Sequence, residues 1–279
     1  MDYRIVIDSC GELTEEMKAD ERLVSAPFTM YVGEEEFIDD ETFDQQSFLE
    51  KVAACPECAK SACPSPDYFK QAFDCDADHV YAITISAELS GAYNSASLGL
   101  NMYLEEHPEK KGYVFNSRSA SVGETLIALK IQELEAAGFS FEEIVERVEQ
   151  YTEEQDTFFV LDNLETLRKN GRLSKMKALV ATALKIKPIL GSTKDGEIVQ
   201  LGQSRGSNKA LVKMVDTIVA TVKNSEERLL GITHCNCKER ALMVRDAILE
   251  KIQVKGVVLL DTAGLSSTYA NDGGVIVVI

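Results

Sequence analysis

The chain has 279 residues, 45% of them hydrophobic, which is enough to bury a large core and is typical of two domains. Its net charge of −17 excludes nucleic-acid binding of the kind that neutralises phosphates with Lys and Arg. The N-terminus lacks the basic start and apolar segment of a signal peptide, and no apolar run reaches the roughly 18 residues of a membrane-spanning helix, so we expect a cytoplasmic protein.

The charged residues are distributed unevenly along the chain. Residues 1–155 contain 11 Lys and Arg against 33 Asp and Glu, whereas residues 156–279 contain 18 against 13. The two parts therefore carry net charges of −22 and +5. Such an asymmetry predicts two separately folded domains, at 1–155 and 156–279.

The first part alternates short apolar runs with helical patterns. Strands that alternate with helices over short connections indicate a mainly parallel sheet covered by helices on both faces, which is an α/β fold. In chain order we predict strands at 4–7, 23–32 (interrupted by Pro27), 37–38, 80–85 and 113–115, and helices capped by Thr14 and Ser65 and at 46–54, 92–104 and 124–137.

The second part follows a different pattern, which predicts an α+β domain with a mixed or antiparallel sheet. Lys194-Asp195-Gly196 between two apolar runs is a strong hairpin signal. The predicted strands are 158–161, 186–191, 197–203, 229–234, 256–260 and 275–279, and the predicted helices are 163–170, 172–185, 208–222 and 237–252.

Three loops of the first part carry serines next to glycine or proline. The strand at 80–85 leads to Ser90 and Gly91 before a helix, Ser61 precedes the helix capped by Ser65, and Ser121 lies in the loop before the helix at 124–137. Loops that follow strands of a parallel sheet gather at the carboxyl edge, where ligands bind. Hydroxyls and free N–H groups at helix N-termini favour an anion there.

The motifs of several enzyme classes are missing. The chain has no G-x-S-x-G, no G-x-x-x-x-G-K-[ST], no G-x-G-x-x-G and no H-E-x-x-H. His79, His107 and His234 lie far apart in the sequence, so no serine has a recognisable base partner. A serine-dependent acyl hydrolase using Ser90 or Ser121 is kept as an alternative.

The seven cysteines are an odd number, which excludes a complete disulfide framework within one chain. Cys55 and Cys58 form a C-x-x-C, but they follow a predicted helix at its C-terminal end, whereas a reactive pair favours the N-terminal end. With Cys63 they also lack a fourth metal ligand at a usual spacing. We therefore predict free thiols and no metal, and keep a thiol redox protein as a second alternative.

Five segments together resemble one protein family. They are Asp8-Ser9; Ser61-Ala62-Cys63-Pro64-Ser65, similar to T-S-x-P-S; Leu89-Ser90-Gly91-Ala92-Tyr93-Asn94-Ser95-Ala96, similar to L-S-G-T-Y-x-S-A; Asn116 to Gly123, similar to D-S-x-x-x-S-x-G; and Leu164 to Ser174, similar to L-x-x-L-x-x-x-G-R-[IL]-S, followed by Lys187-Pro188-Ile189-Leu190 and Asp195-Gly196. In this order and spacing they make the chain similar, nearly end to end, to the DegV family of bacterial fatty-acid-binding proteins.

The resemblance implies an N-terminal α/β/α domain, a C-terminal α+β domain and one long-chain fatty acid held between them, with no cofactor and no catalysis. The family positions that hold the carboxylate correspond to Ser61 and Ser90. Gly91, Ser121 and Arg172 belong to the same motifs and are expected to contribute to the binding site. The chain departs from the family patterns at Ala62, Ala92 and Asn116.

Family carriers present the acyl carboxyl group to a fatty acid kinase, and the phosphorylated acyl group is then used for phospholipid synthesis. The family's H-x-G-P-G segment is missing here, and Tyr269 to Gly273 occupies its place. We expect Arg205 and Tyr269 to face such a partner. For Arg172 two roles are open: it lies at the rim of the head-group site, or it pairs with a carboxylate of the acidic domain.

Overall fold

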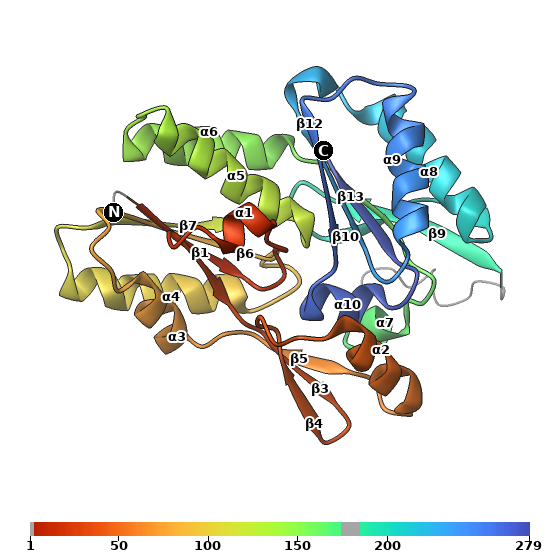
Figure 1. The fold of residues 1–279 in the computed structure, drawn as a ribbon, viewed down its shortest axis with the longest axis horizontal. Coiled ribbons are helices and arrows are strands. Elements are labelled where there is room, and N and C mark those ends of the chain that lie inside the picture. The colour runs from red at the N-terminus through yellow and green to blue at the C-terminus, as the bar shows by residue number, and fades with distance from the viewer. Residues whose placement is uncertain (1–2, 174–184) are drawn as a thin grey trace.

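The computed structural model describes residues 3–173 and 185–279 (Figure 1). It contains a parallel four-stranded sheet from the N-terminal part and a mixed six-stranded sheet from the C-terminal part, so the predicted fold class is confirmed. The helix predicted at 172–185 falls on residues 174–184, which are outside the described part. The domain boundary at 155/156 stays a prediction.

The four-stranded sheet is covered by helices on both faces. Its order is β2-β1-β6-β7, with β2 at Leu23–Ala26, β1 at Tyr3–Asp8, β6 at His79–Thr84 and β7 at Lys111–Asn116. Successive side chains of a strand point to opposite faces. Ile5 and Ile7 therefore pack against α5 (Val122–Ala136) and α6 (Phe141–Glu154), while Val6 packs against α3 (Pro66–Phe73) and α4 (Ala92–Glu106), as the layers in Figure 1 show.

A small antiparallel sheet extends from the first sheet. Its order is β4-β3-β5, with β4 at Glu35–Ile38, β3 at Thr29–Val32 and β5 at Lys60–Ala62, and α2 (Gln45–Ala54) lies next to it in Figure 1. The extended run predicted at 23–32 is divided at Pro27, which has no N–H to donate to a ladder. The edge strand predicted at 37–38 is present as part of β4.

The second sheet has the order β10-β9-β8-β13-β11-β12, and only the β11–β12 pair is parallel. The predicted hairpin is confirmed as the antiparallel pair of β9 and β10. Helices α8 and α9 pack on one face of this sheet through a core of aliphatic side chains. The bounds are β8 at Thr157–Val160, β9 at Ile186–Ser192, β10 at Ile198–Arg205, β11 at Leu229–His234, β12 at Gly256–Asp261, β13 at Val275–Val278, α8 at Ser207–Thr221 and α9 at Lys238–Leu249.

Helix α5 joins the two sheets. Ile127 and Ile131 pack against the first sheet, while Val122 and Leu126 pack against the second. Gly231 on β11 permits this approach, since a Cβ there would lie 2.7 Å from a methyl group of Val122. Because α5 buries side chains on two sides, it carries no polar stripe along most of its length.

Several short elements were not predicted or have different bounds. Helix α5 begins at Val122 and not at residue 124. Helix α6 was missed although Ser140 and Glu143 form a capping box at its start. Helix α10 (Gly264–Ala270) was missed because its sequence is small, polar and buried on nearly all sides. Within residues 3–173 and 185–279, the other short helices are α1 (Glu15–Lys18), which Thr14 caps as predicted, α7 (Glu165–Lys169) and a 3-10 turn at Ser225–Glu227.

Among the helices of the described residues, none combines the length with the apolar composition that crossing a bilayer requires.

Candidate functional site

A narrow cavity of about 100 Å³ lies between the first sheet, the small sheet and the second sheet. Its walls come from the ends of β6 and β7, from β5, β8, β10 and β13, and from α10. The apolar wall residues are Phe28, Ile85, Leu89, Phe159, Leu161, Leu167, Ile198, Leu265 and Ile276. Residues far apart in the sequence thus form an apolar chamber between the two halves of the chain.

Four polar residues at this cavity are close to one another. The Ser61 hydroxyl lies 3.1 Å from the Tyr269 hydroxyl, and either can donate the hydrogen bond. The Arg172 guanidinium lies over the Tyr269 ring, 5.8 Å from its centroid. Arg172 also donates from Nε to the Leu89 carbonyl at 3.1 Å, which links it to the turn that carries Ser90. All four residues line the cavity.

Ser90 keeps a free hydroxyl hydrogen. Its Oγ accepts the Ala92 N–H at 3.2 Å, and its own O–H has no acceptor among the described residues. Helix α4 begins at Ala92 with Gly91 as the N-cap residue. Ser90 is therefore positioned by the local turn while its proton remains available to an acceptor in the cavity.

Arg172 has no carboxylate partner among the described residues. Its guanidinium donates to the backbone carbonyls of Leu89 and Asn170. Of the two roles left open for Arg172, the described contacts favour the position beside the cavity. The role itself stays a prediction.

Three other predicted residues lie away from the cavity. Ser121 is fully buried, and its hydroxyl donates to Glu12 at 2.8 Å and contacts Thr233 at 2.7 Å. Gly91 is exposed at the start of α4, and Arg205 is exposed at the end of β10. Neither lines the cavity, and Ser121 turns inward because α5 begins directly after it.

The placement of Ser61 corrects the sequence interpretation. It was predicted in a loop at the carboxyl edge of the parallel sheet, but it belongs to β5 and pairs with Met30 of β3. The edge of β3 offers unpaired backbone groups, and residues 60–62 satisfy them. Strand geometry then points the Ser61 side chain to the cavity.

The sequence interpretation missed Ser119 and Ser266. Ser119 lines the cavity and its hydroxyl lies 2.7 Å from that of Thr157. Ser266 on α10 also lines it and donates to the Cys10 carbonyl at 3.2 Å. The loop signal that suggested Ser121 applied equally to Ser119, whereas nothing in the sequence pattern indicated α10.

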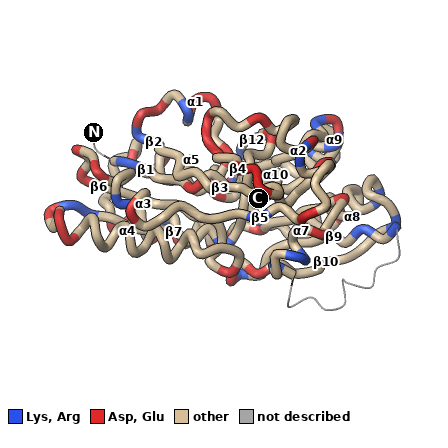
Figure 2. The backbone as a smooth tube through the Cα atoms, turned by 90° about the horizontal axis from the view of Figure 1, so that it is seen from below, with Lys and Arg blue, Asp and Glu red and all other residues tan. Residues whose placement is uncertain are grey.

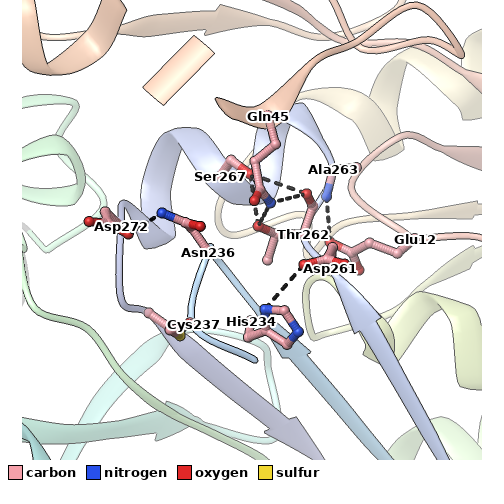
Figure 3. A network of polar contacts seen from close by, with 11 residues as sticks. Glu12, Gln45, His234, Asn236, Cys237, Asp261, Thr262, Ala263, Ser267 and Asp272 are labelled. Atoms are coloured by element: carbon pink, nitrogen blue, oxygen red, sulfur yellow. Dashed lines mark hydrogen bonds and ion pairs between the residues drawn. The ribbon is translucent and has the colours of Figure 1, made fainter. Parts of the chain in front are cut away.

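Helix α10 is held in place by residues of the first half. Asp39 accepts the backbone N–H of Gly264 and, at 2.7 Å, that of Leu265. Figure 3 shows the neighbouring contacts, in which Gln45 of α2 donates to the Thr262 carbonyl at 2.8 Å and Glu12 accepts the Ala263 N–H. The helix that carries Tyr269 is therefore positioned by the N-terminal half of the chain.

The family model described as "Uncharacterised protein, DegV family" matches residues 2–279. The chain belongs to the DegV family. A DegV domain-containing protein of Streptococcus pneumoniae is 35% identical over 253 residues, which are 91% of this chain and 89% of the relative.

Two solved structures of family members are also similar. A DegV family protein from Ruminococcus gnavus, refined with vaccenic acid, has a TM-score of 0.97 and 52% identity, and the match covers 100% of this chain and 99% of that one. The Fatty Acid Kinase (Fak) B3 protein of Streptococcus pneumoniae, loaded with linoleic acid, has a TM-score of 0.88 and 33% identity, with coverage of 100% and 99%.

A cluster of buried acids lies beside the cavity of this DegV family member. Asp8 accepts the N–H groups of Cys10 at 3.0 Å and Ile85 at 2.9 Å. Burial raises the pKa of Asp8 to about 7, that of Glu12 to about 7, and that of Glu124 well above its usual range. Besides burial, the neighbouring Asp8 carboxylate raises the Glu124 pKa, so we infer that Glu124 is neutral and donates its proton to Asp8.

Asp8, Cys10 and Glu124 also place one ligand atom each within 4.8 Å of one another. A metal ion requires deprotonated ligands, but burial raises the pKa of all three groups. Both Asp8 oxygens already accept backbone N–H groups. We infer that the cluster shares a proton, and we assign no metal to it.

The site gives no support to the two alternative functions. No His, Asp or Glu of the described residues lines the cavity, so Ser90 has no base there. His234 is buried on β11 with Nδ1 3.2 Å from an Asp261 oxygen (Figure 3), and burial lowers its pKa. Cys55 follows the last residue of α2, the end of a helix that does not favour a thiolate.

Proposed function

We propose that this protein binds one long-chain fatty acid in the cavity between its two halves, with the carboxylate held by Ser61, Ser90 and Arg172. The observation that carries this proposal is an apolar chamber with hydroxyl donors and one guanidinium grouped at one part of its wall. Fatty acids in family members of 52% and 33% identity support it.

The energetics suit such a ligand. About 14 methylenes at ~0.8 kcal/mol each give a gross term of roughly 11 kcal/mol, from which the costs of association are subtracted. A chain of net charge −17 repels a carboxylate at long range. Affinity for the head group must therefore come from short directed hydrogen bonds inside a desolvated site.

A fatty acid should accompany the protein through purification. We expect organic extraction of the denatured protein, followed by mass spectrometry, to release about one long-chain fatty acid per chain. Native mass spectrometry should show the same mass difference before and after delipidation. A protein that yields no lipid, and that binds neither added palmitate nor added oleate after delipidation, contradicts the proposal.

We further propose that the bound fatty acid is presented to a fatty acid kinase, and that the chain itself catalyses no reaction. The similarity to the Fatty Acid Kinase (Fak) B3 protein of Streptococcus pneumoniae supports this partner. Arg205 is exposed at the end of β10, and Figure 2 shows further Lys and Arg residues on β9 and α8. Arginine binds phosphate through a planar fork, which suits a contact with the partner or its nucleotide.

Arg205→Ala should separate lipid binding from kinase presentation. We expect unchanged palmitate affinity, because Arg205 does not line the cavity, and at least tenfold slower acyl phosphate formation with a kinase of the same organism. Lys213→Ala on α8 is the matched control, because it also removes one positive charge from the surface near β10. Equal rates for wild type and Arg205→Ala would remove Arg205 from the partner surface.

A cytoplasmic location is part of this proposal. All seven cysteines are free thiols, three of them buried, which suits a reducing compartment.

A further inference from the structure

Tyr269 joins two segments that carry the proposed head-group ligands. Its hydroxyl contacts Ser61 of β5, and its ring contacts Arg172, which is bonded to Leu89 beside Ser90. These contacts form a chain from Ser61 through Tyr269 and Arg172 to the Ser90 turn. Tyr269 itself lines the cavity, although the sequence placed it on a partner-facing surface.

The contact between Ser61 and Tyr269 leaves one hydrogen unused. Two hydroxyls bring two O–H groups, and a single hydrogen bond between them uses only one. A carboxylate offers about four lone-pair sites and is a stronger acceptor than a hydroxyl. A carboxylate near these groups can therefore accept from both Ser61 and Tyr269 once they release each other.

We propose that Tyr269 is a head-group ligand, whose hydroxyl releases Ser61 and donates to the carboxylate of the bound fatty acid. This inference rests on the proposed function and deepens it. It assigns Tyr269 to recognition of the acid end of the lipid. The site then selects a carboxylate over an uncharged head group by three hydroxyl donors, from Ser61, Ser90 and Tyr269.

The ring of Tyr269 is held before a ligand enters. Arg172 covers it at 5.8 Å, and α10 is fixed by the backbone N–H bonds that Asp39 accepts. A donor held in place loses little side-chain entropy on binding, so its hydrogen bond contributes more to affinity. Removing only the hydroxyl should leave this packing intact.

The test compares Tyr269→Phe with wild type on two ligands that share one tail, palmitic acid and hexadecan-1-ol. Titration calorimetry on delipidated protein gives both affinities. We expect a loss of about tenfold or more for the acid and of about twofold to fivefold for the alcohol, because a hydrogen bond to a charged group is worth more than one to a neutral group. Tyr68→Phe, which removes a hydroxyl bonded to the Ser25 carbonyl outside the cavity, is the matched control and should change neither affinity.

The outcomes separate the two proposals. Equal losses for acid and alcohol would make Tyr269 a packing residue and overturn the inference, as would an unchanged acid affinity. A double variant of Ser61→Ala with Tyr269→Phe should lose more than the product of the two single losses, because each single variant already spares the ligand from breaking the Ser61–Tyr269 hydrogen bond and the double variant gains this only once. If wild type binds neither palmitic acid nor oleic acid, the proposed function itself fails.

Discussion

Replacing Ser61 and Ser90 together by alanine should weaken palmitate binding by about a hundredfold or more, while the Tm stays within a few degrees of wild type. Each hydroxyl donates to a charged group in the proposed complex, and such a hydrogen bond is worth about 1.5–3 kcal/mol. Losing two such hydrogen bonds therefore lowers the palmitate affinity at least a hundredfold. Calorimetric titration of delipidated protein measures the affinity, and a thermal melt measures the Tm.

The small effect on folding follows from the contacts of the two serines. Ser90 accepts one backbone N–H in its turn, and Gly91 is the N-cap residue of α4, so the helix does not depend on the Ser90 side chain. Ser61 is held in β5 by backbone pairing with Met30. Ser97→Ala on α4, which removes a hydroxyl bonded to the Tyr93 carbonyl, serves as the control and should bind normally.

An unchanged affinity in the double variant would place the carboxylate elsewhere in the cavity. The pair of Ser119 and Thr157 would then be the next candidate, because both line the cavity and lie 2.7 Å apart. A large fall in Tm with intact binding would instead make Ser90 a structural turn residue.

Strand and helix alternation allowed the fold to be predicted from the sequence. The run at 229–234 was predicted as a strand and is β11 with the same bounds, since both its ends are marked by changes from apolar to polar residues. The hairpin of β9 and β10 was predicted because Asp195-Gly196 supplies the positive φ that a tight turn needs, with Gly196 at +88°.

The site was harder to predict, because it depends on which way side chains point. Ser119 and Ser121 are two residues apart in one loop, yet Ser119 faces the cavity and Ser121 faces Glu12. A positive φ at Arg118 and at Ser121 breaks the simple alternation between them. Sequence patterns carry no signal for such loop angles, so the choice between the two serines could not be made.

The position of Tyr269 at the cavity could not be predicted for a related reason. Its helix, α10, has the sequence GLSSTYA, in which weak helix formers predominate and no apolar stripe exists. Its position depends on Asp39, which is 225 residues away in the sequence from Gly264. Contacts of that range are set by the packing of the two sheets, and no local pattern encodes them.

The buried acids should make the folded state less stable as the pH rises. Burial raises the folded-state pKa of Asp8 and of Glu12 to about 7, whereas an unfolded carboxyl titrates near 4. Between these values the folded chain holds protons that the unfolded chain has released. The stabilising contribution of these groups is therefore fully present below about pH 4 and is lost as the pH rises through about 7.

Glu124→Gln should make the folded state more stable at high pH, because it removes the cost of keeping the buried Glu124 carboxyl protonated. Burial raises the Glu124 pKa well above its usual range, so at pH 8 folding must keep a proton on a group that ionises in the unfolded chain. An amide keeps the shape and can still donate to Asp8 without binding a proton. Each unit of pKa difference is worth about 1.4 kcal/mol, and we expect the Tm at pH 8 to rise by about 5 °C or more.

Thermal melts at pH 5.5 and pH 8 test this expectation. The gain from Glu124→Gln should be clearly larger at pH 8. Folding must put a proton back on Glu124, and this protonation costs much less free energy at pH 5.5 than at pH 8. Glu146→Gln, at an exposed position of α6, controls for the loss of one charge from a chain of net charge −17 and should give the same small shift at both pH values. If Glu124→Gln lowers the Tm equally at both pH values, the inference that folding keeps a proton on Glu124 is contradicted.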